Sequence, residues 1–160
     1  MEDETLKLQC GSQWFSKRNV EGWALHDADE GATHMTGRID FDAAFAAPPH
    51  VALFLAALDV GGDTDQRVSV TVKSAATDHF EVTVATSGDS TVWGCQVSWF
   101  AFAKSQAHNA NGARVQAGRV PLFANEAGYK LASGAGKARK TVRKVAYPVP
   151  FGGGGGGGGG

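Results

Sequence analysis

Residues 39–60 read IDFDAAFAAPPHVALFLAALDV, and residues 79–103 read HFEVTVATSGDSTVWGCQVSWFAFA. The second stretch alternates apolar and polar side chains twice, first over HFEVTVAT and then over QVSWFAFA. A period of two residues is typical of antiparallel strands that bury one face. The first stretch is apolar at nearly every position from Val51 to Leu58, which predicts a strand buried on both faces.

Further strands are predicted outward from these two stretches. Residues 66–73 (QRVSVTVK) alternate in the same way, with three valines on one face and Arg67 on the other. Shorter strands are predicted at Leu6–Cys10, Gly22–Leu25 and Met35–Phe41. Many short strands separated by Gly, Asp and Thr turns indicate an all-β fold, which we expect to be a six-stranded antiparallel β-sandwich over residues 1–104. Phe80 and Trp99 are predicted core residues.

The pattern ends after Lys104. Residues 105–151 are rich in Ala, Gly, Asn, Lys and Arg, and their scattered apolar residues are too few to build a core. We expect an extended C-terminal arm here. Its basic centre is KARKTVRK, which contributes Lys137, Arg139, Lys140, Arg143 and Lys144 as candidate partner-binding residues. A solvated, solubilising tail is the alternative. Residues 152–160 are all glycine, and no function is assigned to them.

The net charge of −1 hides a strong asymmetry. Residues 1–104 contain 7 Lys and Arg against 15 Asp and Glu, whereas residues 105–160 contain 8 against 1. An acidic body with a basic arm predicts an acidic partner for the arm, or contact between the arm and another subunit. Nucleic acid is the weaker expectation, because only Tyr147 and Phe151 supply aromatic rings near the basic centre.

Several classes of protein are disfavoured. The start MEDETLKLQ lacks the basic and apolar regions of a signal peptide and no long apolar segment follows, which predicts a cytoplasmic protein without a membrane span. Cys10 and Cys95 are expected to be reduced thiols, with pairing between them as the alternative. The five histidines lack metal-ligand spacing, and no nucleophile elbow or paired-carboxylate motif is present. We therefore expect no catalytic residue, metal or cofactor.

Several short motifs follow one another at characteristic spacing. Ile39-x-Phe41, Phe45 and Pro48-Pro49-x-Val51 are followed by Leu58-Asp59-Val60, Arg67, an aromatic-led strand at Phe80, the Thr86 turn with Asp89, and Val97-Ser98-Trp99. In this order they resemble the H-type lectin domain, the family of snail agglutinin and of the discoidin C-terminal domain. The resemblance implies a trimeric β-sandwich that binds galactose or N-acetylgalactosamine between protomers and is not an enzyme.

The resemblance also implies roles for individual residues. Arg67 corresponds to a donor to sugar hydroxyls, Trp93 to a stacking surface or an interface anchor, and Asp29 or Glu30 to an acceptor. Asp89 is a further candidate for bonding hydroxyls. Each has a plainer interpretation: Arg67 paired with a nearby aspartate, Trp93 in the core, Asp89 in a turn, and Asp29 and Glu30 in a solvated loop.

The sequence departs from the family where the sugar should touch. The family usually has a tryptophan after the threonine of this turn, and the snail type then has a histidine, but this chain has Ser87 and Gly88. We therefore expect a lectin-like module, most simply a homotrimer, that serves as a structural or adaptor subunit. Its arm over residues 105–151 would contact other proteins of a larger, cytoskeletal or ciliary, assembly. The alternative is a carbohydrate-binding lectin for galactose-type glycans.

Overall fold

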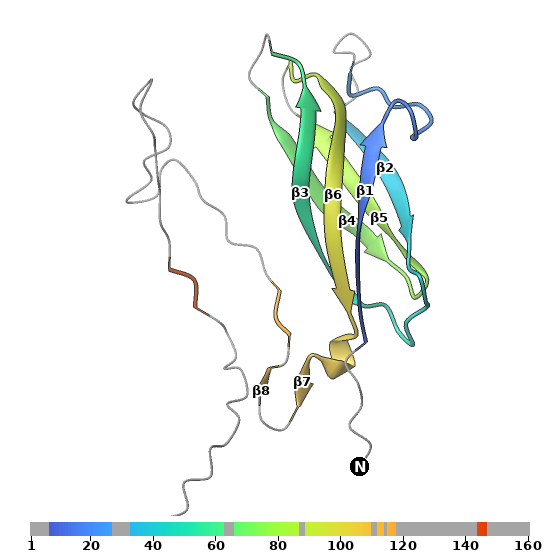
Figure 1. Ribbon diagram of the computed structural model, residues 1–160, viewed down its shortest axis with the longest axis vertical. Helices are drawn as coiled ribbons and strands as arrows, with labels where there is room; N and C mark the ends of the chain where they lie inside the picture. The colour runs from blue at the N-terminus through green and yellow to red at the C-terminus, as the bar shows by residue number, and fades with distance from the viewer. Residues whose placement is uncertain are drawn as a thin grey trace, which may run out of the picture. The chain divides into compact units, whose positions relative to one another are not determined.

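Two three-stranded antiparallel sheets stack face to face in this chain (Figure 1). The computed structural model describes residues 7–26, 33–62, 66–86, 89–109, 112–113, 115–117 and 144–146. Both sheets come from residues 8–102, where the alternating pattern predicted strands. The prediction of an all-β sandwich is confirmed.

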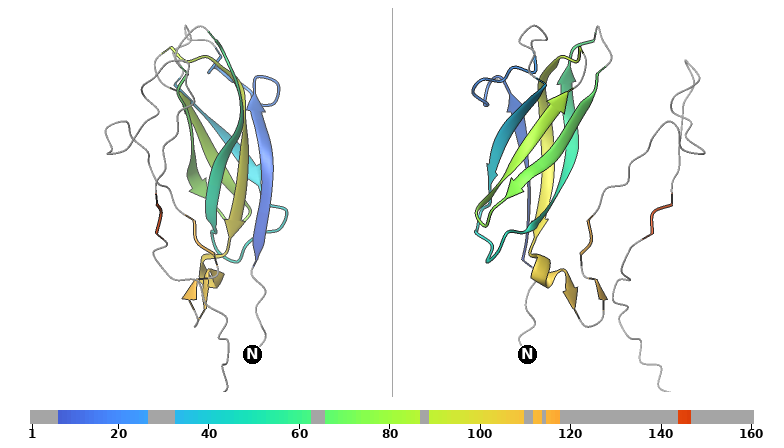
Figure 2. Two further views of the ribbon diagram at one scale, coloured as in Figure 1. Left: turned by 60° about the vertical axis from the view of Figure 1, so that its left-hand side comes forward. Right: turned by 180° about the vertical axis from the view of Figure 1, so that it is seen from behind.

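Each sheet has a central strand flanked by two others. The first sheet has the order β1-β6-β3, from β1 (Leu8–Ser16), β6 (Val92–Phe102) and β3 (His50–Val60). The second has the order β2-β5-β4, from β2 (His34–Asp40), β5 (His79–Thr86) and β4 (Val68–Ala75). All neighbouring strands run antiparallel. Figure 2 shows the second sheet in front in its right-hand view.

The core lies between the two sheets. Phe80, Val82 and Val84 of β5 are at most 1 % exposed, as their alternation predicted. Trp99 of β6 is 7 % exposed, and its ring lies 5.3 Å from that of Phe80 in an edge-to-face arrangement. The predicted core positions of Phe80 and Trp99 are therefore confirmed. Aromatic pairs of this geometry add to the gain from burying apolar area.

The prediction that Val51–Leu58 is buried on both faces is wrong. This segment lies in β3, where Phe54, Leu55 and Leu58 are 51, 37 and 45 % exposed. Phe54 lies on the outer face of the sheet, which the second sheet does not cover. Leu55 and Leu58 pair with inward-facing positions of β6, but β3 is an edge strand and leaves their flank open to water. A continuous apolar run in an edge strand therefore produces an exposed apolar surface.

The strand predicted at Gly22–Leu25 is also wrong. Gly22 has a φ of 68°, and residues 20–26 form turns and irregular backbone. A left-handed residue interrupts an extended strand, and glycine adopts it at no steric cost. Trp23 and Leu25 are nevertheless buried, because the loop folds over one end of the core.

The first strand is longer than the predicted Leu6–Cys10. It runs to Ser16 and buries Phe15, whose ring lies where a side chain on Gly37 would otherwise project. Gly11 interrupts the apolar alternation of this strand because the Trp99 indole lies against it. Such packing between sheets is not visible in the local sequence.

The two cysteines are too far apart to form a bond within one chain. Cys10 pairs with Phe100 and Cys95 pairs with Phe15, so they lie five ladder positions apart. At the rise of a strand this is about 17 Å, whereas the Cα atoms of a disulfide lie within about 7 Å. Both are free thiols; Cys10 is exposed and Cys95 is buried.

The sandwich unit extends a few residues past β6. A 3-10 helix (η2, Lys104–Gln106) follows, and the Gln106 side chain accepts a hydrogen bond of 2.8 Å from the backbone N–H of Lys7. The chain divides into two units, residues 1–108 and 109–160, so the first unit ends four residues after the expected boundary at 104. β7 (His108–Asn109) and β8 (Gly112–Ala113) pair as short strands. Among the described residues there is no helix long and apolar enough to cross a membrane.

Candidate binding surfaces

Arg67 and Asp89 are brought together by the loops at one end of the sandwich. Ser90 is buried, and its Oγ accepts a hydrogen bond of 2.9 Å from the backbone N–H of Arg67. The next residue, Thr91, donates its N–H to Gln66 Oε1 at 3.0 Å. The loop before β6 is thus tied to the residues that open β4. Both Arg67 and Asp89 are exposed, so this arrangement holds a guanidinium and a carboxylate at the surface.

Trp93 lies on the surface because of a β-bulge. In the ladder between β3 and β6, Asp59 pairs with Gly94 and Val60 pairs with Val92, which leaves Trp93 as the extra residue. A bulge re-aims the side chains on either side of it. Val92 is fully buried, whereas Trp93 is 48 % exposed. The interpretation that placed Trp93 in the core is therefore wrong.

His26 packs against Trp93 and was not singled out from the sequence. The two rings lie 5.6 Å apart between centroids, at 47° to each other. Two hydrogen bonds of the Val92 backbone fix the loop that carries His26 to β6. The Val92 N–H donates to Leu25 O at 2.7 Å, and the Val92 carbonyl accepts from Trp23 Nε1 at 2.9 Å. The residues around His26 in the sequence do not predict this contact, because its neighbour Trp93 comes from a distant strand.

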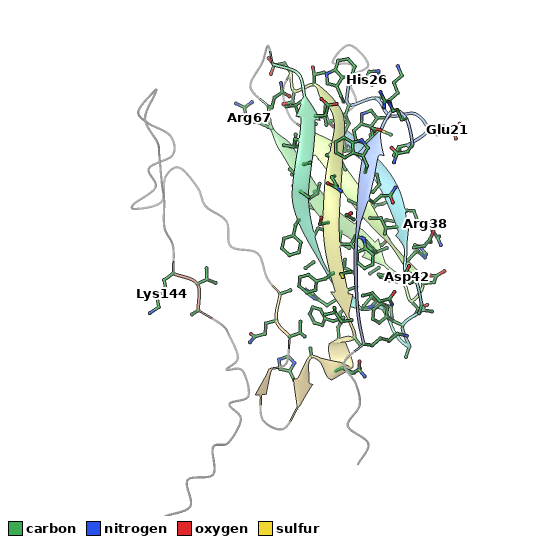
Figure 3. The ribbon with its side chains drawn as sticks, in the orientation of Figure 1. Glu21, His26, Arg38, Asp42, Arg67 and Lys144 are labelled. Atoms are coloured by element: carbon green, nitrogen blue, oxygen red, sulfur yellow. The ribbon has the colours of Figure 1, made fainter. Side chains whose placement is uncertain are left out.

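Different contacts hold the two groups of candidate residues. The backbone N–H of Arg67 bonds Ser90 Oγ, whereas Trp93 packs against the His26 ring. Figure 3 shows Arg67 and His26, the ring partner of Trp93, on different sides of this end of the sandwich. The structure therefore divides the residues implied by the resemblance into two groups. One group is Arg67 with Asp89, and the other is Trp93 with His26.

The remaining candidates are largely outside the part of the chain that the structure describes. This holds for Asp29 and Glu30 and, in the arm, for Lys137, Arg139, Lys140 and Arg143. Lys144 is described and exposed, and the neighbouring Val145 is 57 % exposed. Over the described residues, no three His, Cys, Asp or Glu side chains are grouped so as to hold a metal ion.

The outer face of the first sheet carries a cluster of aromatic rings. Phe54 stacks on Phe100 at 5.8 Å, Phe100 on Phe102 at 5.9 Å, and His50 lies 5.1 Å from Phe102. Leu8 pairs with Phe102 from β1 and is 48 % exposed. We call Leu8, His50, Phe54, Phe100 and Phe102 the phenylalanine patch. Leu8 and Phe54 are exposed, His50 and Phe100 are partly buried, and Phe102 is buried beneath them at 4 % exposure. Burial, and to a smaller extent the Lys104 ammonium, lowers the pKa of His50.

The outer face of the second sheet has the opposite character. Arg38 Nε lies 2.7 Å from Asp40 Oδ1, and Asp78 Oδ1 lies 2.7 Å from His79 Nδ1. The hydrogen bond from His79 lowers the pKa of Asp78. Lys73 Nζ and Glu81 Oε2 lie 3.4 Å apart on the same face. The sandwich thus exposes one apolar face and one charged face.

Part of the sandwich resembles a known family of protein domains. Residues 36–102 match the family model of the H-type lectin domain. The resemblance inferred from the motifs is confirmed. The matched part of the H-type lectin domain runs from β2 to the end of β6, and it contains Arg67, Asp89 and Trp93 but not β1. Residues 36–102 are therefore similar to lectin-like carbohydrate-binding modules, a family of non-enzymatic domains. A comparison with curated proteins gave no match.

Proposed function

We propose that this chain is a non-enzymatic binding module that forms a homotrimer and acts as an adaptor subunit of a larger assembly. The phenylalanine patch carries this proposal. Phe54 of the edge strand β3 is 51 % exposed and stacks on Phe100 of the central strand β6. Contiguous exposed apolar surface is typical of protein interaction sites, because its removal from water stabilises the complex.

The contrast between the two sheet faces supports an assembly with one orientation. The charged network of the second sheet is costly to bury and remains in water. The apolar face of the first sheet gains from burial. Self-association through the phenylalanine patch therefore leaves the second sheet and the loop ends accessible to other partners.

Light scattering tests the oligomer. A trimer of the 16.7 kDa chain has a mass of about 50 kDa. Phe54→Glu places a charge in the patch and should convert the trimer to a monomer. Ser69→Glu, on the exposed outer face of β4, is the matched control and should leave the mass unchanged. A monomeric wild-type protein would contradict the proposal.

The adaptor role rests on the basic arm. Its charge of +7 against the acidic body fits an acidic protein surface in a cytoplasmic, cytoskeletal or ciliary assembly. Truncation after His108 keeps the compact first unit and removes the arm. The truncated protein should remain folded and lose its incorporation into the assembly. Unchanged incorporation would contradict the role of the arm.

A second candidate function is glycan binding at Arg67 and Asp89. It is favoured by the family match and by Ser90, which fixes the two exposed charged residues at the same end of the sandwich. A guanidinium donates and a carboxylate accepts, so together they suit the hydroxyls of galactose or N-acetylgalactosamine. Calorimetric titration with both sugars tests this. Arg67→Ala should weaken binding, and Arg38→Ala, on the second sheet, should not.

A further inference from the structure

The outer edge of β1 differs from the other strand edges of the sandwich. Edge strands commonly carry a charge, a proline or a bulge, which prevents another strand from adding to them. β2 carries Arg38 and Asp40, and the ladders of β3 and β4 each contain a register shift. β1 has none of these features, because it reads LQCGSQWFS and pairs with β6 without interruption.

The side chain of Asn19 shows which backbone groups of β1 point away from β6. Its amide donates a hydrogen bond to the Trp14 carbonyl and accepts one of 2.8 Å from the Ser16 N–H. The amide therefore bonds the outer edge of β1 as a peptide group of a neighbouring strand would. Successive residues of a strand direct their backbone groups to opposite sides, so the even-numbered residues of β1 face outward.

The other end of the strand agrees with this alternation. Lys7 O accepts a hydrogen bond of 3.3 Å from Ala103 N, directly after β6, so an odd-numbered residue faces β6. Between the two ends, Cys10 and Ser12 direct both their N–H and their C=O groups to the outer edge. An extended segment laid along this edge can bond these groups in the way that a further strand of the sheet does.

The outer edge is accessible from residue 10 to residue 14. All five of these residues are exposed. The Trp14 indole extends over β6 instead of the edge, since a Cβ atom on Gly94 would stand 2.9 Å from its Cζ2 and Nε1 atoms. Gln9 bonds the backbone of Ala43 through its side chain, and this contact covers the start of the strand. Figure 1 shows β1 on the side of the first sheet away from β3.

Positive charges stand at both ends of this accessible stretch. Lys7 directly precedes β1, and Lys17 and Arg18 directly follow it. Among the described residues none of these cations forms an ion pair. Glu21, further along the same loop, offsets only part of the charge (Figure 3). We propose that the outer edge of β1 binds an extended segment of another protein that carries acidic residues at both of its ends.

This contact is additional to the trimer and to the arm, and neither of these fits the edge as well. Antiparallel pairing of β1 with β1 of a second copy would bring Lys7 of one chain close to Lys17 and Arg18 of the other, and like charges on opposite strands are destabilising. The arm is basic, so the same cations repel it. An acidic-flanked segment gains both the backbone hydrogen bonds and the attraction of opposite charges.

Calorimetric titration of the full chain with blocked synthetic peptides tests the proposal. The probe is Asp-Asp-Thr-Val-Thr-Val-Thr-Asp-Asp, whose central residues favour a strand, and the control peptide has Lys in place of each Asp. The acidic peptide should bind at least about tenfold more tightly than the basic one. It should also slow hydrogen exchange at the Cys10, Ser12 and Trp14 amides, and leave exchange at Thr36 of β2 unchanged.

N-methylation of the probe separates strand addition from attraction between charges. An acidic peptide methylated at all five central amides keeps its charge but cannot donate to a strand edge. It should lose binding. Unaltered affinity would mean that the flanking charges alone hold the peptide, and would overturn strand addition.

Two variants of the protein test the same edge. Ser12→Pro removes an outward N–H and keeps the ladder with β6, since a proline is tolerated where the N–H of an edge strand faces water. It should weaken the acidic peptide at least about tenfold. Joint Lys17→Glu and Arg18→Glu substitution leaves the backbone unaltered and should shift the preference toward the basic peptide. Lys73→Glu, exposed on the second sheet, is the control and should not.

The remaining outcomes distinguish this inference from the proposed trimer. The acidic peptide should bind the Phe54→Glu chain as it binds the wild type, so a failure of the trimer does not alter this test. Equal affinity for the acidic and basic peptides would overturn the proposed partner. Self-association of the Phe54→Glu chain that Ser12→Pro removes would assign the edge to a second copy, and would overturn the proposal as well.

Discussion

The ring of Phe15 fills the space next to Gly37 on the opposite sheet. A Cβ atom on Gly37 would lie 2.1 Å from Cε1 of Phe15, well inside van der Waals contact. Phe15 is 2 % exposed and belongs to the central cluster of the core. The two sheets therefore approach closely at this point only because residue 37 has no side chain.

This contact makes Gly37 sensitive to substitution. Gly37→Ala should destabilise the fold by about 1–3 kcal/mol, because the added methyl displaces a packed ring. Urea unfolding measures the change. Gly62→Ala is the control, since a Cβ there meets no heavy atom within 4 Å, and it should leave the free energy of unfolding nearly unchanged. Equal effects of the two substitutions would contradict the close approach.

The burial of Phe80 predicts a large loss of stability. Phe80 is 0 % exposed, and Phe80→Ala should cost about 3–5 kcal/mol because it removes a buried ring and leaves a cavity. Phe54→Ala removes a similar ring that is 51 % exposed and should cost far less. Thermal and urea denaturation measure both changes, and Phe80→Ala is also measured in the monomeric Phe54→Glu background, against that background alone, to remove any contribution from assembly. A small effect at Phe80 would mean that its ring does not pack in the core.

The hydrogen bond from Trp23 to Val92 fixes the loop that carries His26. Trp23→Phe keeps a ring in the core but removes the indole N–H that lies 2.9 Å from Val92 O. The buried carbonyl then lacks this partner, and we expect a loss of about 1–3 kcal/mol. The loss of the contact between His26 and Trp93 should also raise the quenching of Trp93 by acrylamide. Unaltered quenching would show that the loop is held in another way.

His50 links stability to pH. Burial, then the Lys104 ammonium, lowers the pKa of His50 from its ordinary value of 6.5. The unfolded chain thus takes up this proton at a higher pH than the folded chain. The contribution of neutral His50 to the free energy of unfolding is fully present above pH 6.5. It is lost as the pH falls through the lowered pKa of the folded state. His50→Gln should flatten the pH dependence of unfolding below neutrality, whereas His34→Gln, an exposed position, serves as the control.

The thiols should differ sharply in reactivity. Burial raises the pKa of Cys95 to about 11, and its side chain is fully buried. Because the thiolate is the reactive form, a thiol reagent should modify Cys10 rapidly and Cys95 only after unfolding. A titration with and without denaturant distinguishes the two. Rapid modification of both cysteines in the folded protein would contradict the burial of Cys95.

The local sequence was sufficient to predict the buried residues of a strand whose apolar and polar side chains alternate. Alternation over Phe80–Val84 and around Trp99 predicted the core, because side chains on a strand point to opposite faces in turn. The motifs from Ile39 to Trp99 also predicted the family. The same reasoning failed at Val51–Leu58, since an apolar run does not show whether the strand lies at the centre or the edge of a sheet. It failed at Gly22–Leu25 because burial there comes from a loop.

The character of the surfaces depended on the tertiary structure. The exposure of Trp93 is set by the β-bulge in β6 opposite Asp59 and Val60, which forms only when β6 pairs with β3. The ring that packs against Trp93, His26, comes from a remote loop. The placement of Trp14 over Gly94 likewise requires β1 to pair with β6. The alternation of side chains is a property of each strand, so the sequence determined the sandwich and its core. Pairing between distant strands brings binding residues together, so only the folded chain decided which of them share a surface.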